Sequence, residues 1–247
     1  MLILNAEEQK KLIDMNEVID YVAVALKEFS SGRTVTPIRA ALPFRKGENT
    51  SLVMPSVAEE LESVGLKVVT VAPNNKKIGK KTINGVVMLS DFETGEPISL
   101  LEGSHLTMVR TGALSGVATK YLSREDSKKL CVIGTGEQAK GLVASVLAVR
   151  EIEEVLLYNL LAPIQEGVFN SEDIYGELGR IVNGELKGRN SDQEITVFES
   201  VGVAVSADKV VVEAIEAALE ETVVDIIVAQ YIYDKALKNN VGTTIQL

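Results

Sequence analysis

The sequence predicts an α/β protein with two parts, one an α+β arrangement of short strands and helices and the other a βαβ unit. Residues 130–133 form an apolar run that ends at a Gly-Thr-Gly turn, and residues 137–150 favour a helix. A second apolar run, residues 154–158, follows this helix after a short loop, as a parallel strand pair requires. Residues 1–121 instead contain short runs separated by prolines, glycines and polar turns.

The turn after the first of these strands is suited to binding phosphate. It consists of Gly134, Thr135, Gly136, Glu137, Gln138 and Ala139. The first glycine permits a tight turn, the second lets the backbone approach a pyrophosphate, and the helix start presents N–H groups to the phosphates. Ordinary strand–helix turns also contain such glycines, but the flanking strands favour a dinucleotide site. We therefore expect NAD or NADP as the cofactor.

Composition limits the classes of partner. The chain has 247 residues, is 46% hydrophobic and carries a formal net charge of −10. Acidity of this size argues against nucleic acid or an anionic membrane surface as a partner. No apolar run is long enough to span a membrane, and the first residues do not resemble a signal peptide, so we expect a cytoplasmic protein.

Cysteine and histidine are each present once. Cys131 lies in an apolar strand, which predicts a buried structural thiol and excludes a disulfide framework. His105 is interpreted as a local structural residue beside Ser104, because one histidine cannot build a metal site. We therefore expect no metal.

The N-terminal part begins with a short strand at residues 2–4. Two helices are expected next, residues 6–13 capped by Asn5 and residues 17–30 capped by Asn16. Residues 35–43 contain two prolines and are interpreted as an extended edge segment. Arg39, inside this segment, is either an edge residue that faces water or a binder of anions.

Two further strands are predicted at residues 51–54, ending at Pro55, and at residues 64–71. Alternation in the second strand places Lys67 on one face with Val69 and Val71, and Leu66 on the other. Lys67 is therefore either a lysine whose ammonium reaches water at a strand edge or a lysine directed into a pocket.

A basic loop at residues 73–81 is either a solvated excursion or the border of an anionic ligand. Residues 83–89 and 98–101 then form a hairpin with its turn at Thr94-Gly95. Ser104 is expected to cap a helix that extends to residue 121. Arg110, beside a row of small residues in this helix, is the better candidate for an anion site.

Together these segments resemble the ornithine cyclodeaminase/mu-crystallin family. The residues that carry the resemblance are Arg39 before Leu-Pro, Val53-Met-Pro55, Gly65-Leu-Lys67, Pro73-Asn-Asn75, Arg110-Thr-Gly112, the Gly134-Thr-Gly136 turn, Ile195-Thr-Val-Phe-Glu-Ser-Val-Gly202 and the C-terminal helix from Asp225 to Leu237.

The resemblance implies a Rossmann domain inserted into a substrate and dimerisation domain. The latter would comprise residues 1–121 and 224–247, and the Rossmann domain residues 122–223. It also implies a homodimer.

The resemblance further implies roles for individual residues. Arg39 and Arg110 would bind a substrate carboxylate, and Lys67 would polarise or exchange protons with the carbon–nitrogen centre. The cofactor would be lined by Thr82, Thr111, Gly134, Thr135, Gly136, Glu137, Gln138, Ala139 and Ser200.

Two positions depart from the family pattern near these residues. Ornithine-using members carry a glutamate at the position of Leu52, where it can meet a side-chain ammonium. An apolar residue offers no counter-charge, which disfavours ornithine and favours a small neutral amino acid or a cyclic imine. The family's His-Pro pair is Ala72-Pro73 here, and the sequence suggests no consequence.

The predicted Rossmann domain lacks segments that the family has. After Asn159 the family continues with further βα units and an aspartate that serves as acid/base partner, whereas Leu160 follows here. Residues 206–222 resemble a piece that the family places before residue 160. We expect a chain that is incomplete and partly reordered, with a genuine rearrangement as the alternative. Asn159, which is not an acid, favours NADP slightly.

The expected function is an NAD(P)-dependent oxidoreductase acting on a small amino acid or its imine, of the alanine dehydrogenase or ketimine reductase type. One alternative is ornithine cyclodeaminase, a lyase. The other is a non-catalytic homologue that binds the cofactor.

Overall fold

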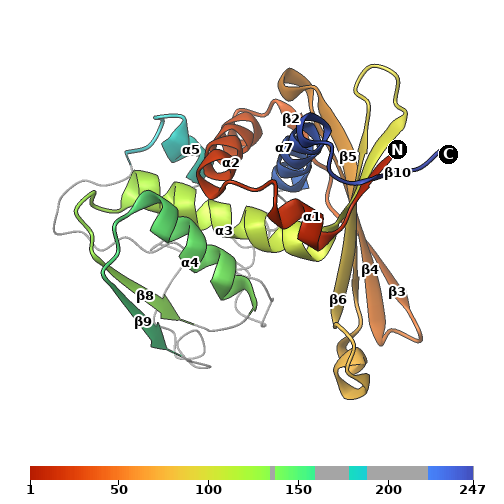
Figure 1. The fold of residues 1–247 in the computed structure, drawn as a ribbon, viewed down its shortest axis with the longest axis horizontal. Coiled ribbons are helices and arrows are strands. Elements are labelled where there is room, and N and C mark those ends of the chain that lie inside the picture. Colours follow the sequence, from red (N-terminus) through yellow and green to blue (C-terminus); the bar gives the residue numbers. More distant parts are fainter. Residues whose placement is uncertain (134–136, 159–177, 188–221, 247) are drawn as a thin grey trace. The chain divides into compact units, whose positions relative to one another are not determined.

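The structure is a computed structural model that describes residues 1–133, 137–158, 178–187 and 222–246 (Figure 1). The chain divides into two compact units. The first, called the sheet unit, comprises Met1–Asp14, Ser31–Thr107 and Glu220–Leu247, and the second, called the helical unit, comprises Met15–Ser30 and Met108–Leu219. The predicted domains, residues 1–121 with 224–247 and residues 122–223, stay a prediction beside this division into compact units.

The sheet unit is built on an eight-stranded sheet, counted over the described residues, with the order β10-β1-β7-β6-β5-β4-β2 and β3 paired to β4. Every pairing is antiparallel except β1 with β7. The strands are β1 (Leu2–Leu4), β2 (Thr34–Val35), β3 (Ala40–Phe44), β4 (Asn49–Ala58), β5 (Ser63–Val71), β6 (Ile83–Ser90), β7 (Pro97–Glu102) and β10 (Thr243–Thr244).

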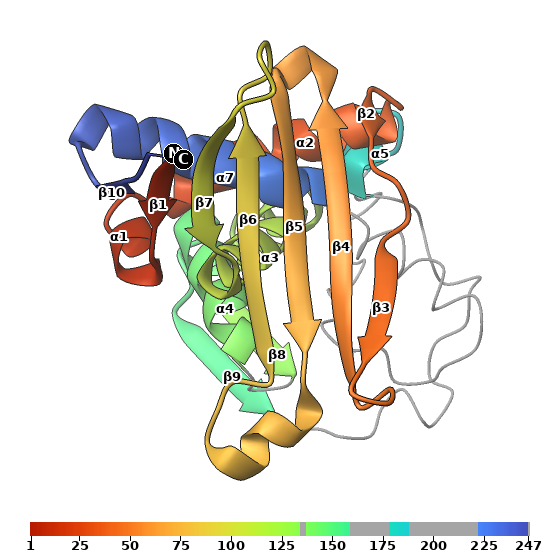
Figure 2. The ribbon, with the colours of Figure 1, turned by 90° about the vertical axis from the view of Figure 1, so that its right-hand side faces the viewer.

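One face of this sheet is covered by the helix α7 (Thr222–Asn239), which packs against β4, β5 and β6 (Figure 2). Burial alternates along β5, where Ser63, Gly65 and Lys67 are buried and Leu66 and Val68 are half-buried. The predicted alternation in this strand is therefore confirmed, and Lys67 lies on the face toward α7.

The closest approach of α7 to the sheet is at Gly65. A Cβ atom at this position would lie 2.7 Å from the Cδ1 atom of Ile226 and 2.5 Å from the carbonyl oxygen of Met88. Because these separations are too short for real atoms, glycine is what allows Ile226 to seat against β5. The residue before Ile226 on α7 is Asp225, which is placed by the same contact.

Pro55 does not end its strand, contrary to the prediction. β4 continues to Ala58, and Pro55 pairs with Leu66 of β5. On the other side of β4, β3 pairs only as far as Val53 and β2 begins pairing at Val57. The missing N–H of proline is tolerated because this gap requires no hydrogen bond at residue 55.

The first helices begin at polar caps. Asn5 and Glu8 form a capping box on α1 (Ala6–Lys10), which confirms the predicted cap, although the helix ends three residues early. Helix α2 (Met15–Ser30) begins before the predicted Asn16 cap. Two 3₁₀ turns, η1 (Glu59–Leu61) and η2 (Pro73–Ile78), follow β4 and β5.

Helix α3 (Gly103–Leu122) is capped by Glu102 rather than by Ser104. The Glu102 carboxylate accepts hydrogen bonds from the backbone N–H groups of Ser104 (3.1 Å) and His105 (2.8 Å). The predicted cap is therefore displaced by two residues. Before it, the β6–β7 turn is as predicted, with Gly95 at a φ of 74° and its N–H bonded to the Asp91 carbonyl.

The helical unit contains a close crossing of α3 with α4 (Glu137–Val149). A Cβ atom at Gly112 would lie 2.4 Å from the carbonyl oxygen of Gly141, and one at Gly141 would lie 2.4 Å from that of Met108. The Ser145 hydroxyl donates a 2.5 Å hydrogen bond to the Gly112 carbonyl across this crossing. The small residues predicted to favour close packing of α3 therefore serve that purpose. Helix α5 (Leu178–Val182) packs against α2 in this unit.

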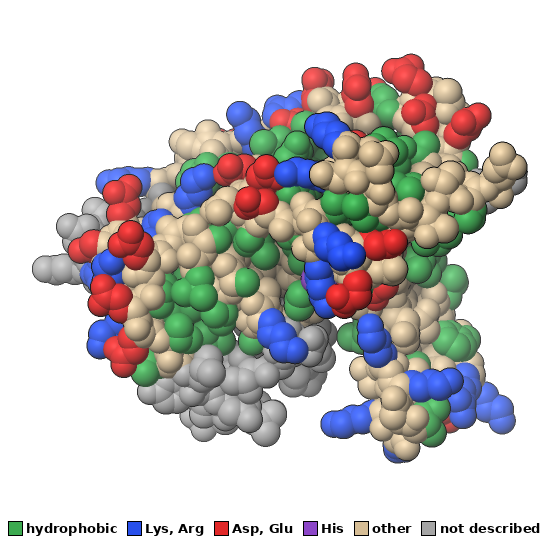
Figure 3. Space-filling model, in the orientation of Figure 1, with side chains coloured by type: hydrophobic (Ala, Val, Ile, Leu, Met, Phe, Trp, Pro, Cys, Tyr) green, Lys and Arg blue, Asp and Glu red, His purple; other side chains and the backbone are tan. Residues whose placement is uncertain are grey.

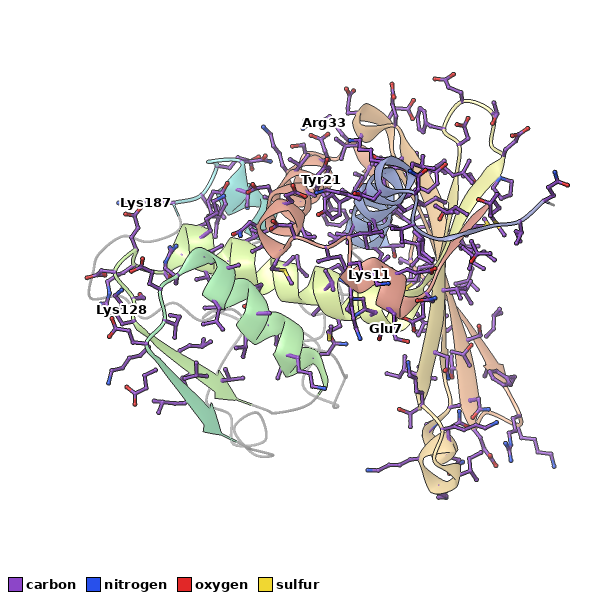
Figure 4. The ribbon with its side chains drawn as sticks, viewed as in Figure 1. Glu7, Lys11, Tyr21, Arg33, Lys128 and Lys187 are labelled. Atoms are coloured by element: carbon purple, nitrogen blue, oxygen red, sulfur yellow. The ribbon has the colours of Figure 1, made fainter. Side chains whose placement is uncertain are left out.

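The predicted βαβ unit is present. β8 (Lys129–Ile133) and β9 (Glu154–Tyr158) pair in parallel, and α4 connects them. Lys128, just before β8, forms ion pairs with Glu151 (3.0 Å) and Glu153 (3.6 Å) before β9 (Figure 4).

Cys131, however, is exposed, so the predicted buried thiol is wrong. Among the described residues, β8 pairs with one strand, β9. Cys131 points to the opposite face of β8 from the buried Val132.

Within the described part of the chain, no helix combines the length and apolarity needed to cross a bilayer.

Substitution of Gly112 by alanine tests the α3–α4 crossing. The new methyl group would meet backbone of α4, which cannot move independently, so we expect a loss of about 1–3 kcal/mol in the free energy of unfolding. Gly116→Ala is the matched control, because its methyl group would meet the movable side chain of Ile19. Urea denaturation measures the free energy of unfolding of both variants. A larger value for Gly112→Ala than for Gly116→Ala would contradict this packing.

The Glu102 cap predicts a pH-dependent contribution to stability. Burial alone would raise the pKa of Glu102, but hydrogen bonds from Ser104 and His105 outweigh it and hold this pKa below the ordinary 4.5. Because the folded-state pKa is lowered, the contribution is present above the unfolded pKa and is lost as the pH falls through the folded pKa.

The Glu102→Gln variant should therefore be less stable than wild type by about 0.5–1 kcal/mol at pH 7, with a difference that shrinks toward pH 4. Thermal melts of both proteins across this range would measure the difference. A difference that is constant with pH would contradict a role for the charged carboxylate.

Candidate functional site

A buried ion pair joins Lys67 on β5 to Asp225 on α7. The distance from Lys67 Nζ to Asp225 Oδ1 is 2.7 Å, and the two side chains are 3% and 2% exposed. A contact this short between an ammonium and a carboxylate is a strong, charge-assisted hydrogen bond. Lysine is rarely buried to this extent, which makes this position the most unusual on the sheet.

The register of the sheet places Arg39 and Leu52 around Lys67. Arg39 directly precedes β3, whose first residue Ala40 pairs with Val53, so Arg39 is level with Met54. Met54 in turn pairs with Lys67, which puts Arg39 two strands from Lys67, or about 10 Å across the sheet. Arg39 is half-buried.

Leu52 lies on the same face as Met54 and pairs with Val69, two residues beyond Lys67. Leu52 therefore lies about 7 Å along the strands from the level of Lys67 and on the same face of the sheet. This is the position at which ornithine-using members carry a glutamate. The surface beside the ammonium is apolar here.

Thr82 is not close to Lys67. Its carbonyl oxygen accepts a 2.7 Å hydrogen bond from the N–H of Ala72 at the far end of β5 and β6. Lys67 pairs with Val87, five residues further along β6, which corresponds to about 17 Å. Thr82, for which a cofactor role is predicted, therefore lies in a different part of the sheet unit from the ion pair.

Arg110 and Thr111 lie on α3 in the helical unit and are both buried, at 7% and 9% exposure. They directly precede Gly112, where α3 crosses α4. This crossing falls at Gly141, one helical turn into α4. The structure therefore brings these two residues near the start of the helix that follows the predicted phosphate-binding turn.

The structure describes the two flanks of the predicted phosphate-binding turn and not the turn itself. Gly134, Thr135, Gly136 and Ser200 lie outside the described residues, as does the side chain of Glu137. The helix begins at Glu137, and Gln138 and Ala139 are half-buried in its first turn. The strand before the turn and the helix start after it are the flanks that a dinucleotide-binding turn requires, and such a turn needs N–H donors and no intruding Cβ atom.

The basic loop is an exposed end of the sheet unit. This end, called the basic tip, combines the β3–β4 turn with the η2 region, and Lys and Arg side chains gather there (Figure 3). Its cations are Arg45, Lys46, Lys76, Lys77, Lys80 and Lys81, all exposed. Both interpretations of this loop remain predictions.

The fold and these residues define a dinucleotide-binding α/β protein with a second, sheet-based unit that contains a buried lysine. Comparison with known proteins is more specific. The family model of the ornithine cyclodeaminase/mu-crystallin family matches residues 1–167 and 161–223. The chain belongs to this family, as the sequence predicted.

Relatives include the Delta(1)-pyrroline-2-carboxylate reductase of Bacillus cereus, which is 44% identical over 342 aligned residues covering all of both chains. Because this chain has 247 residues, that alignment contains gaps.

Among solved structures, the Thermococcus litoralis enzyme of the same name, in complex with NADH and L-proline, is 28% identical with a TM-score of 0.79, covering 99% of this chain and all of the other. An archaeal alanine dehydrogenase dimer with bound NAD has the same fold, at 23% identity and a TM-score of 0.79, covering 100% of this chain and 99% of the other.

Sequence reasoning missed the part played by Asp225, which was noted only as the start of the C-terminal helix. A signal was present, because this aspartate stands alone in the apolar run Val223-Val-Asp-Ile-Ile-Val-Ala229. An acidic residue inside such a run needs a buried partner, although the sequence does not show which cation supplies it.

Proposed function

We propose that this chain reduces 1-pyrroline-2-carboxylate to L-proline with NADH or NADPH. The comparisons support the class to which this reaction belongs, an NAD(P)-dependent oxidoreductase acting on a small amino acid or its imine, as the sequence predicted. The single observation that carries the choice of substrate is that the buried Lys67 and the apolar Leu52 lie on the same face of the sheet, two residue levels apart.

This surface suits a neutral ring better than a charged side chain. The ring of the cyclic imine is hydrocarbon apart from its nitrogen, so Leu52 can contact it without loss. Ornithine would place an ammonium against this side chain, and an unpaired buried cation costs several kcal/mol. The lyase alternative, ornithine cyclodeaminase, is accordingly disfavoured.

The residues of this chain supply binding and the proton. Reduction of the imine adds a hydride to carbon and a proton to nitrogen, and a bound nicotinamide ring provides the hydride. Lys67 donates the proton from its ammonium and takes another from water afterwards. We assign binding of the substrate carboxylate to Arg39 and Arg110, because a planar guanidinium group matches a carboxylate.

A direct assay tests this reaction. Purified protein with NADH or NADPH and 1-pyrroline-2-carboxylate should show loss of absorbance at 340 nm and formation of L-proline. Ornithine with catalytic NAD should give no proline. Bound cofactor without turnover on cyclic imines, keto acids with ammonia, or amino acids would instead favour the non-catalytic alternative.

Leu52→Glu tests the apolar surface separately. A carboxylate here would repel the substrate carboxylate, so we expect KM for the imine to rise about tenfold or more, equivalent to roughly 1.4 kcal/mol. Leu52→Met conserves volume and polarity and should change KM by less than about threefold. Equal KM values in the two variants would place Leu52 away from the substrate.

The open face of the sheet supports a homodimer. It carries the apolar cross-strand row Pro55–Leu66–Met88–Leu100, and beside it the row Val53–Val68–Val86, which is apolar until it meets Glu102 on β7. α7 covers the other face, and Figure 2 views the sheet from its open side, with α7 behind it. A contiguous apolar face of this kind is typical of a protein interface, and a second copy of the chain is the occupant that we propose.

Leu66→Glu should separate this dimer. In a symmetric pair the change introduces two carboxylates into the centre of the interface, where burial of charge is costly. Sedimentation should then give the 26.6 kDa chain mass for the variant and twice that mass for wild type. Leu147→Glu, at an exposed leucine of the helical unit, is the control. An unchanged mass for Leu66→Glu would exclude this face as the interface.

The choice between NAD and NADP, the cofactor roles of Thr82 and Ser200, the missing and reordered segments, and a cytoplasmic location remain predictions.

A further inference from the structure

We infer that Asp225 is a positioning residue for the reaction, acting through Lys67. This inference rests on the proposed function, in which Lys67 supplies the proton. Asp225 does not need to touch the substrate, because its carboxylate acts on the ammonium that does. The contact that carries the inference is the 2.7 Å ion pair between two side chains that are almost fully buried.

The first step concerns geometry. Lysine has four rotatable side-chain bonds, so an unrestrained Nζ atom samples many positions. A charge-assisted hydrogen bond to a carboxylate on a packed helix limits that freedom. Asp225 is itself fixed, since its neighbour Ile226 is seated against Gly65, two residues from Lys67 on the same face of β5.

The second step concerns charge. Burial disfavours an ammonium, whereas a carboxylate in direct contact favours it. A lysine that donates a proton in every turnover must regain it from water before the next. Asp225 therefore orients the ammonium of Lys67 and favours its return to the protonated form after each turnover. Asp225 itself gives no proton to the substrate.

Asp225→Asn is the principal variant, because it keeps the shape and one oxygen acceptor but removes the charge. We expect kcat to fall about tenfold to a hundredfold, which is within the usual contribution of general acid catalysis. The KM for NADH or NADPH should stay within about threefold of wild type. The solvent deuterium isotope effect on kcat should rise, because proton transfer then limits turnover.

Asp234→Asn is the matched control. This aspartate lies on the same helix and bonds to Gln230 rather than to a lysine, at 3.0 Å. Its replacement should leave kcat and the solvent isotope effect unchanged. Circular dichroism and cofactor binding would establish that each variant is folded.

A double-mutant cycle with Lys67→Met separates the positioning role from a general structural one. If Asp225 acts through Lys67, Asp225→Asn should lower kcat in the wild-type background and should lower it no further in the Lys67→Met background. An equal loss in both backgrounds would overturn the inference. So would an unchanged kcat for Asp225→Asn.

Failure of the proposed function gives a different result. Wild-type kcat in Lys67→Met would contradict the assignment of the proton to Lys67, and this inference would be overturned with it. If Asp225→Asn does not fold, Asp225→Glu keeps the charge and displaces it by one methylene. That variant should fold with a lowered kcat and a raised solvent isotope effect, and wild-type values of both would overturn the inference.

Discussion

The contact between Lys67 and Asp225 is the constraint on which the sheet unit depends. Two charges removed from water are stable only as a pair, so β5 and α7 must meet at this point in one register. Gly65 makes that meeting possible because its missing side chain leaves room for Ile226. The buried pair and the close packing beside it therefore specify the same position of the helix on the sheet, and a shift along either element would break both.

The remainder of the sheet follows from this arrangement. One face is closed by α7, and, apart from Lys67, the strands that cross beneath it carry small or apolar residues on that side. The opposite face has its own apolar rows, which is why alternation along β4, β5 and β6 is apolar on both sides rather than apolar and polar. Such a pattern is expected where one face is an internal core and the other meets a second protein surface.

Much of this fold could be predicted from local sequence. The face of Lys67, the Asn5 cap, the Thr94-Gly95 turn and the βαβ unit all depend on residues close together in the chain, and the structure has each of them.

The failures involve neighbours distant in sequence or competition between nearby groups. Asp225 is 158 residues from its partner, Pro55 is tolerated because two other strands leave a gap, and Glu102 caps α3 in place of the expected Ser104. The candidate site could likewise be predicted only in part. The sequence singled out Lys67 and Arg39 as separate residues, whereas their position at the same level of the sheet follows from the strand register.

The basic tip gives the molecule an uneven electric field. The chain as a whole carries a formal charge of −10, so an anion at long range is repelled on average. Within about 8 Å of the tip at physiological salt, however, the local cations outweigh the distant acids. A carboxylate or phosphate compound will therefore approach this end of the sheet unit preferentially, and this preference will weaken as ionic strength rises.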